Sequence, residues 1–115
     1  MTQNHTVART IDHGVELGTI AEGLVAHIRS SPLAETMIAA PGQGISEHQH
    51  GKSLYFAQNA HLTLEGRTYT MDGAFYALIP EQVPHGWQHA GGEGDAVIAS
   101  FEPGHKTYEL YQLGR

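Results

Sequence analysis

Two histidines separated by one residue, His48 and His50, have the spacing in this chain that most directly suggests chemistry. In an extended strand, residues i and i+2 point to the same face and lie about 6.6–7 Å apart along the chain. Both imidazoles can then converge on one metal ion, each nitrogen about 2.0–2.1 Å from it. An isolated His-x-His is more often a pair of exposed polar residues on an edge strand. A metal site therefore needs further ligands elsewhere in the chain.

A second group of histidines lies in "PEQVPHGWQH", residues 80–89. Pro80 ends one expected strand, and the Val-Pro turn after it lets His85 begin the next. By alternation, His85, Trp87 and His89 share one face. If that face is interior, the two histidines can meet the His-x-His pair. The alternative is that His85 is a hydrogen-bonded core residue and His89 faces water.

Short runs of alternating hydrophobicity, separated by turn residues, must position these side chains. Such a series of short strands predicts an all-β sandwich or barrel. The first ten residues are polar and are interpreted as a loose arm, and residues 105–115 are ambiguous between a strand and a helical turn. The expected strands cover residues 14–20, 23–29, 35–42, 53–58, 61–66, 66–71, 73–80, 86–90 and 95–103.

Composition excludes several classes of function. The 115 residues fit one domain spanning 1–115, and the absence of cysteine excludes disulfides, thiolate zinc sites and cysteine nucleophiles. A formal charge of -6 with only six Lys and Arg residues, not clustered, argues against nucleic acid as a partner. No apolar run approaches the ~20 residues of a membrane span, and the N-terminus lacks a signal-peptide core. We expect a soluble cytoplasmic protein that does not bind membranes.

Taken together, "GISEHQH" (44–50) and "DGAFYALIPEQVPHGWQH" (72–89) resemble the two motifs of the cupin superfamily. The hairpin segment 61–71 between them also resembles the cupin inter-motif region. The resemblance covers about residues 35–103, and the combination is more specific than either motif alone. The matching positions are Gly44, His48, His50, Gly73, Pro80 and His85.

This resemblance implies an all-β, cupin-type jelly-roll β-barrel with a site inside it, open at one end. A metal ion would be held by His48, His50 and His85. Small cupins are often homodimers, and the expected strands in 14–20 and 23–29 are candidates for the interface. Candidates for lining the pocket are Phe56, Phe75 and Trp87, although core packing explains the two Phe residues equally well.

The chain departs from the family where a glutamate ligand is expected, near Leu54. Gln58, His89, His61 or water are the candidates to replace it. Three neutral imidazoles leave a divalent ion with a net site charge near +2, which makes it a stronger Lewis acid for anionic ligands. Imidazole ligands suit a transition metal such as iron, zinc, nickel or copper.

The resemblance implies two candidate functions, an enzyme and a sensor. The first is a metal-dependent enzyme acting on a small oxygenated or carbonyl compound. It would be either a dioxygenase, similar to three-His cupins that cleave diketones, or a Lewis-acid cyclase or isomerase, similar to cupin polyketide cyclases. Tyr55, His61 and Glu47 are candidates for relaying protons. The second is a non-catalytic sensor that binds a small ligand, since residues 62–87 also resemble the effector-binding arm of AraC-type regulators. A third interpretation is a barrel with purely structural histidines.

Overall fold

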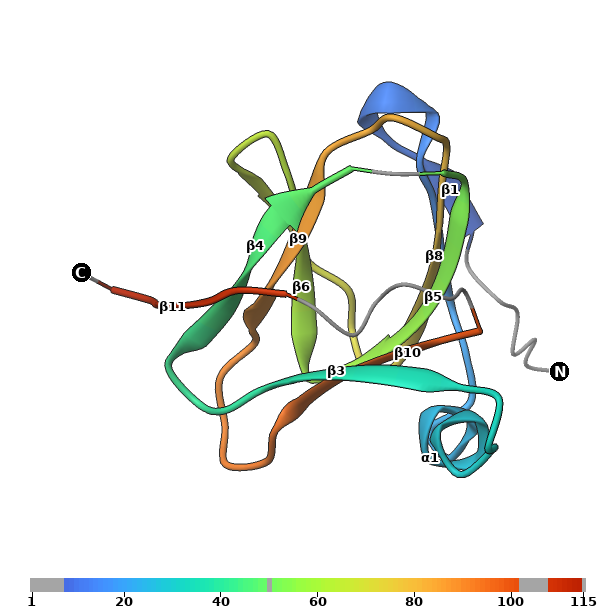
Figure 1. The fold of residues 1–115 in the computed structure, drawn as a ribbon, viewed down its shortest axis with the longest axis vertical. Helices are drawn as coiled ribbons and strands as arrows, with labels where there is room; N and C mark the ends of the chain where they lie inside the picture. The colour runs from blue at the N-terminus through green and yellow to red at the C-terminus, as the bar shows by residue number, and fades with distance from the viewer. Residues whose placement is uncertain (1–7, 50, 102–107, 115) are drawn as a thin grey trace, which may run out of the picture.

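The protein is an all-β, barrel-like structure made of two antiparallel sheets, seen in a computed structural model that describes residues 8–49, 51–101 and 108–114 (Figure 1). Sheet A has the order β1–β2–β8–β5–β10–β3, with β1 (Ala8–Thr10), β2 (Glu16–Thr19), β8 (Phe75–Ile79), β5 (Ser53–Gln58), β10 (Ala96–Ser100) and β3 (Glu35–Ala39). Sheet B has the order β11–β4–β9–β6–β7, with β11 (Leu110–Gln112), β4 (Gln43–His48), β9 (His85–His89), β6 (Ala60–Leu64) and β7 (Arg67–Tyr69). The sheets face each other without joining into a closed barrel. The predicted all-β class is confirmed.

Alternation along the strands places the core between the sheets. In β5, Ser53, Tyr55 and Ala57 are buried, whereas Leu54, Phe56 and Gln58 are more exposed. Since neighbouring residues of a strand point to opposite faces, the first set is interior and the second exterior. The core between the sheets contains large side chains from both, among them Leu17, Tyr55, Leu62, Phe75 and Trp87.

One expected strand is a helix. Residues 23–29 contain α1 (Leu24–Arg29), in which Val25 and Ile28 are buried. These two side chains are three residues apart, which places them on one helical face. Both are β-branched residues, which are typical of strands, and the segment is only six residues long, so the strand prediction followed the residue types instead of the spacing. The prediction of a strand here was wrong.

Other sequence expectations are refined by the structure. The ambiguous tail forms a short strand, β11, paired with β4. Asn59, with φ of 57°, turns the chain from β5 in sheet A to β6 in sheet B, so these strands do not form a hairpin. Part of the expected N-terminal arm is strand β1, and residues 1–7 lie outside the described residues.

The connections gather at two ends of the molecule. The 3-10 turn η1 (Asp12–Gly14) and the link from β8 to β9 lie at the top of Figure 1, whereas α1 and the loop from β9 to β10 lie at the bottom. His48 and His85 are at the strand ends that meet the top connections. Within the described ranges, the structure contains no helix with the length and apolar character needed to span a membrane.

Candidate metal and ligand site

A β-bulge in β4 turns His48 toward the interior. Ile45 pairs with Trp87 and His48 pairs with His85, so three steps along β4 match two steps along β9. In a regular strand Ile45 and His48 would point to opposite faces, and one extra residue restores them to the same face. The rings of His48 and His85 consequently lie 4.7 Å apart, centroid to centroid.

Gly86 makes room for this bulge. A Cβ atom at Gly86 would lie 2.5 Å from the carbonyl oxygen of Ile45, a distance that real Cβ atoms do not adopt, and 3.0 Å from Cγ of Glu47. Because glycine has no side chain, the backbone of β4 and the side chain of Glu47 can pass over β9 at this point. The bulge therefore depends on a glycine in the neighbouring strand.

The two histidines are oriented in the same way by backbone carbonyl groups. Nδ1 of His85 lies 2.8 Å from the carbonyl oxygen of Val83, and Nδ1 of His48 lies 3.2 Å from that of Ser46. A carbonyl oxygen only accepts, so each Nδ1 must carry the hydrogen, and in the neutral ring each Nε2 keeps its lone pair. This is the tautomer of a histidine that binds a metal through Nε2, with its orientation fixed by an outer hydrogen bond.

Tyr55 reaches this pair from sheet A. Its hydroxyl lies 2.9 Å from Nε2 of His85, and given the tautomer above, the hydroxyl donates. The Tyr55 ring also packs 5.3 Å from the His85 ring and 5.4 Å, edge-on, from that of Trp87. Tyr55 thus lies between the imidazole and the indole. Sequence reasoning placed it near the missing glutamate, and the structure brings it to the site.

Trp87 and Phe75 lie in the interior core, and the pocket-lining role predicted for them stays a prediction. Both are fully buried, with ring centroids 6.3 Å apart. Ser100, which the sequence analysis missed, pairs with Tyr55 in sheet A and is 1% exposed. Directly paired residues of antiparallel strands point to the same face, so Ser100 is interior as well. No sequence signal marks it, because its strand is buried on both faces.

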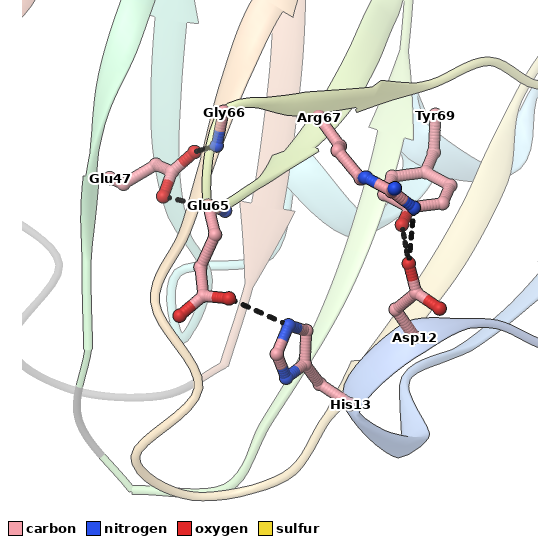
Figure 2. Close-up of polar contacts among 7 residues, drawn as sticks. All are labelled: Asp12, His13, Glu47, Glu65, Gly66, Arg67 and Tyr69. Carbon is pink, nitrogen blue, oxygen red and sulfur yellow. Dashed lines mark hydrogen bonds and ion pairs between the residues drawn. The ribbon is translucent and has the colours of Figure 1, made fainter.

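Glu47 makes its hydrogen bonds on the outer side of the site. Its carboxylate oxygens accept hydrogen bonds of 2.9 Å from the backbone N–H groups of Glu65 and Gly66, at the turn between β6 and β7 (Figure 2). Both residues have positive φ, 49° and 84°. Both carboxylate oxygens are engaged on the outer side, which does not support the expected role of Glu47 in proton relay.

The turn η1 is tied to the same hairpin. Asp12 accepts hydrogen bonds from the Tyr69 hydroxyl and, at 3.1 Å, from Arg67, while His13 lies 3.0 Å from Glu65 (Figure 2). The hydrogen bond from Tyr69, with help from the Arg67 charge, lowers the pKa of Asp12 below its usual value. The same bond raises the pKa of Tyr69. These contacts link sheet A to sheet B at the end that carries His48 and His85.

The structure does not bring His89 to His85. They are four positions apart on β9, which corresponds to about 13 Å along the strand. Nε2 of His89 donates to the carbonyl of Gly94, and Nδ1 accepts from the N–H of Gly91 at 2.9 Å. Both ring nitrogens are therefore used to hold the loop between β9 and β10, and this corrects the expectation that His89 shares the site.

Gln58, Phe56 and His61 also lie away from the histidine pair. Gln58 and Phe56 are on the exterior face of β5, and Phe56 packs against the small cluster that contains Val25 of α1. His61 pairs with Gln88, one residue out of phase with the interior Trp87. Burial, followed by the nearby His89, lowers the pKa of His61 below its usual value. The sequence analysis expected Gln58 and Phe56 to point to the interior, whereas the structure places both on the exterior face of β5.

His50 lies outside the described residues, so the predicted triad of His48, His50 and His85 stays a prediction. Among the residues that the structure does describe, no three His, Cys, Asp or Glu side chains form a group that could hold a metal ion. A hollow of about 380 Å³ lies on the exterior of sheet A, and neither His48 nor His85 lines it. Its lining residues are Thr10, Gly14, Glu16, Lys52, Leu78, Pro80 and Glu81.

Comparison with known proteins gives no family for this chain. No family model matches it, and no curated protein or solved structure matches it either. The functional argument therefore depends on the geometry of the site.

Proposed function

We propose that the protein is a metal-dependent enzyme that acts on a small oxygenated or carbonyl compound. The observation that supports this most is the matched presentation of His48 and His85. Each ring donates from Nδ1 to a carbonyl two residues earlier and keeps the Nε2 lone pair. The bulge in β4 aligns the two residues across neighbouring strands. Two buried or half-buried imidazoles with the same tautomer fit a transition metal better than magnesium or calcium.

In this proposal His48 and His85 are two protein ligands and His50 is the third. The metal would be iron, zinc, nickel or copper, and when bound it would polarise a carbonyl or enolate oxygen as a Lewis acid or support oxygen chemistry. The outer carbonyls of Ser46 and Val83 would keep both rings in the binding orientation. The proposed enzyme is therefore either a dioxygenase or a Lewis-acid enzyme, that is, a cyclase or an isomerase.

Tyr55 is the residue that we propose to move a proton. Its hydroxyl donates a hydrogen bond to Nε2 of His85. This hydrogen bond is broken once Nε2 binds another partner. The hydroxyl can then donate to an oxygen of the substrate, in an interior that also contains the fully buried Trp87 and Phe75. The proton-relay role predicted for His61 is not part of this proposal, since His61 lies out of phase with the interior.

Metal analysis of wild type and variants tests the proposal. The protein is purified without a tag or chelating column, and wild type, His85→Ala and His48→Ala are incubated with each divalent ion and then desalted. We expect about one equivalent in wild type and a large loss in both variants. His27→Ala, on the exposed surface of α1, is the matched control and should retain the metal. Wild type without bound metal under all conditions would contradict the proposal.

Oxygen uptake divides the two reaction classes. With the iron or copper form and 2,4-pentanedione, consumption of oxygen favours the dioxygenase. Conversion of a carbonyl substrate without oxygen consumption favours the cyclase or isomerase. Tyr55→Phe should keep the metal and lose rate in either case.

One observation favours a second candidate, a sensor that binds a small ligand without catalysis. Nε2 of His85 already has a hydrogen-bond partner in Tyr55, which is how a metal-free interior satisfies a buried imidazole. Metal analysis separates the candidates, since the sensor requires no ion at His85.

We also propose a cytoplasmic homodimer. The expected interface strands need revision, since residues 24–29 are helical and β2 lies between β1 and β8. Strand β1 is an edge strand of sheet A whose three residues are all exposed, and it is the better candidate for pairing with a second copy. A monomer in sedimentation at micromolar concentration would contradict this part.

A further inference from the structure

The exterior hollow on sheet A lies along a row of residues that pair across four strands. Thr10 pairs with Glu16, and Glu16 pairs with Leu78. Leu78 pairs in turn with Leu54, which is on the exterior face of β5. Since directly paired residues of antiparallel strands point to the same face, the whole row is exterior. The hollow is at the end of the sheet that carries η1 and the link from β8 to β9 (Figure 1).

A missing side chain explains why the hollow is open. Gly14 and Gly18 lie two residues to either side of Glu16. At Gly18 the space is taken by Tyr76, because a Cβ atom there would lie 2.3 Å from Cε2 of that ring. At Gly14 the only described atom that a Cβ would meet within 4 Å, chain neighbours aside, is Cγ of Pro80 at 3.8 Å. The φ of 75° at Gly14 favours glycine, so this space stays unfilled.

The wall of the hollow formed by β1 and η1 is fixed by contacts to sheet B. Nη2 of Arg9 donates to the carbonyl of Thr70 at 3.3 Å, and Asp12 accepts from the hydroxyl of Tyr69 (Figure 2). The hollow is therefore formed before any ligand arrives, as is usual for small-molecule sites. Its volume of about 380 Å³ is near the lower end of the roughly 300–1,000 Å³ typical of such sites.

Charged groups of both signs line the hollow. Oε2 of Glu16 accepts a hydrogen bond from the hydroxyl of Tyr76, and among the described residues Oε1 has no hydrogen-bond partner. Lys52 and Glu81 are exposed, and neither has an ion pair or a side-chain hydrogen bond within the part of the chain that the structure describes. These three groups are thus available to a ligand.

This lining selects for a molecule that carries both charges. The carboxylates of Glu16 and Glu81 attract an ammonium group and repel an anion, whereas the ammonium group of Lys52 attracts a carboxylate and repels a simple cation. Leu78 and Pro80 line the same hollow and offer apolar surface to a short hydrocarbon group. A compact zwitterion with an apolar side chain matches all of these groups.

We propose that the exterior hollow binds a free amino acid with an aliphatic side chain. Its ammonium group binds Glu16 and Glu81, and its carboxylate binds Lys52. Its side chain packs on Leu78 and Pro80. This site is separate from the proposed metal site and does not depend on it.

NMR titration of the isotope-labelled, metal-free protein with L-leucine tests the inference. We expect saturable shifts of the amide signals of Glu16 and Leu78. Two analogues serve as controls, each of which lacks one of the charged groups of leucine. These are 4-methylpentanoate, which has no ammonium group, and isopentylamine, which has no carboxylate. Each should bind at least about threefold more weakly than L-leucine, since it loses the attraction of one exposed charged partner or pair.

Substitutions at the charged positions assign each contact. Lys52→Met should weaken L-leucine binding about three- to fivefold, as expected for an exposed ion pair, and should not weaken isopentylamine binding. Glu81→Gln should weaken L-leucine binding by a similar factor and should not weaken 4-methylpentanoate binding. The matched control is Glu93→Gln, in the loop between β9 and β10, which should leave all three affinities unchanged. All three positions are exposed, so the variants should fold.

The outcomes are independent of the metal site. Absence of saturable shifts with L-leucine overturns the inference, and so does an equal affinity of wild type for isopentylamine and L-leucine. Unchanged L-leucine affinity in both Lys52→Met and Glu81→Gln overturns it as well, because the ligand would then bind elsewhere. The titration is made in chelator, so a failure to bind L-leucine leaves the proposed function standing. A failure to take up metal likewise leaves the exterior site standing.

Discussion

Replacing Tyr55 by phenylalanine tests whether Nε2 of His85 is a metal ligand or only a hydrogen-bond acceptor. The substitution keeps the ring that packs against His85 and Trp87 and removes the hydroxyl that donates to Nε2 at 2.9 Å. His85 is 1% exposed, so water cannot readily replace that donor. In metal-free protein we expect a loss of about 1–3 kcal/mol in the free energy of unfolding, the cost of leaving a buried acceptor without this partner.

Adding metal should reduce that loss. Wild type must give up the Tyr55 hydrogen bond before an ion occupies Nε2, whereas the variant lacks that hydrogen bond. The variant should therefore bind zinc at least as tightly as wild type, and binding to the native state adds stability to each. With saturating zinc, the difference in unfolding free energy between the two proteins should fall well below its metal-free value.

Urea unfolding of both proteins, in chelator and in excess zinc, measures this cycle. Tyr76→Phe is the matched control, because its hydroxyl donates to Glu16 on the exterior of sheet A. Its effect should be the same with and without zinc. An equal loss for Tyr55→Phe in both conditions would refute the reasoning and remove His85 from the ligand set.

Three further predictions concern the framework of the site. Gly86→Ala should lower the free energy of unfolding by about 1–3 kcal/mol and abolish zinc binding, because the added Cβ would meet the backbone of β4. Gly44→Ala is the control: its Cβ would meet only an exposed tyrosine ring, so its effect in urea unfolding and metal analysis should be milder. Tyr69→Phe should raise the pKa of Asp12 in a carboxyl NMR titration, since that hydroxyl is the main cause of the lowered value. Because the pKa of His61 is below 6.5 in the folded state, the unfolded state binds more protons as pH falls through 6.5. As the pH falls through 6.5, the stability of the protein should decrease, and it should level off below the pKa of His61 in the folded state. His61→Gln should remove this part of the pH dependence when unfolding is measured from pH 8 to 5.

Local patterns in the sequence predicted much of the fold. Pro80 and the alternating run before it correctly indicated the end of β8, and the Val-Pro turn placed the start of β9 at His85. Helix α1 was missed because its buried residues, Val25 and Ile28, are β-branched and so typical of strands, although their spacing of three fits a helix. The parity of β5 was also misjudged, since both faces of that strand carry apolar residues and only the pairing with β10 and β8 distinguishes them.

The orientation of His48 could not be predicted from its own strand. It depends on the bulge, and the bulge depends on Gly86 in another strand. No pattern within residues 43–48 contains that information, because the contact that permits the extra residue is between strands. The His-x-His spacing suggested one interior face by simple alternation. The structure reaches an interior His48 by breaking the alternation.

The same bulge separates the roles of two neighbouring residues. It points His48 toward His85 and leaves Glu47 on the other side, where Gly86 lets the side chain cross β9 to the turn at Glu65 and Gly66. Glu47 is therefore a structural anchor, and its carboxylate is kept from the histidine pair. Proton transfer beside His48 and His85 would then have to use the phenol of Tyr55 and the imidazoles themselves. For this reason Tyr55→Phe should affect catalysis more strongly than Glu47→Gln.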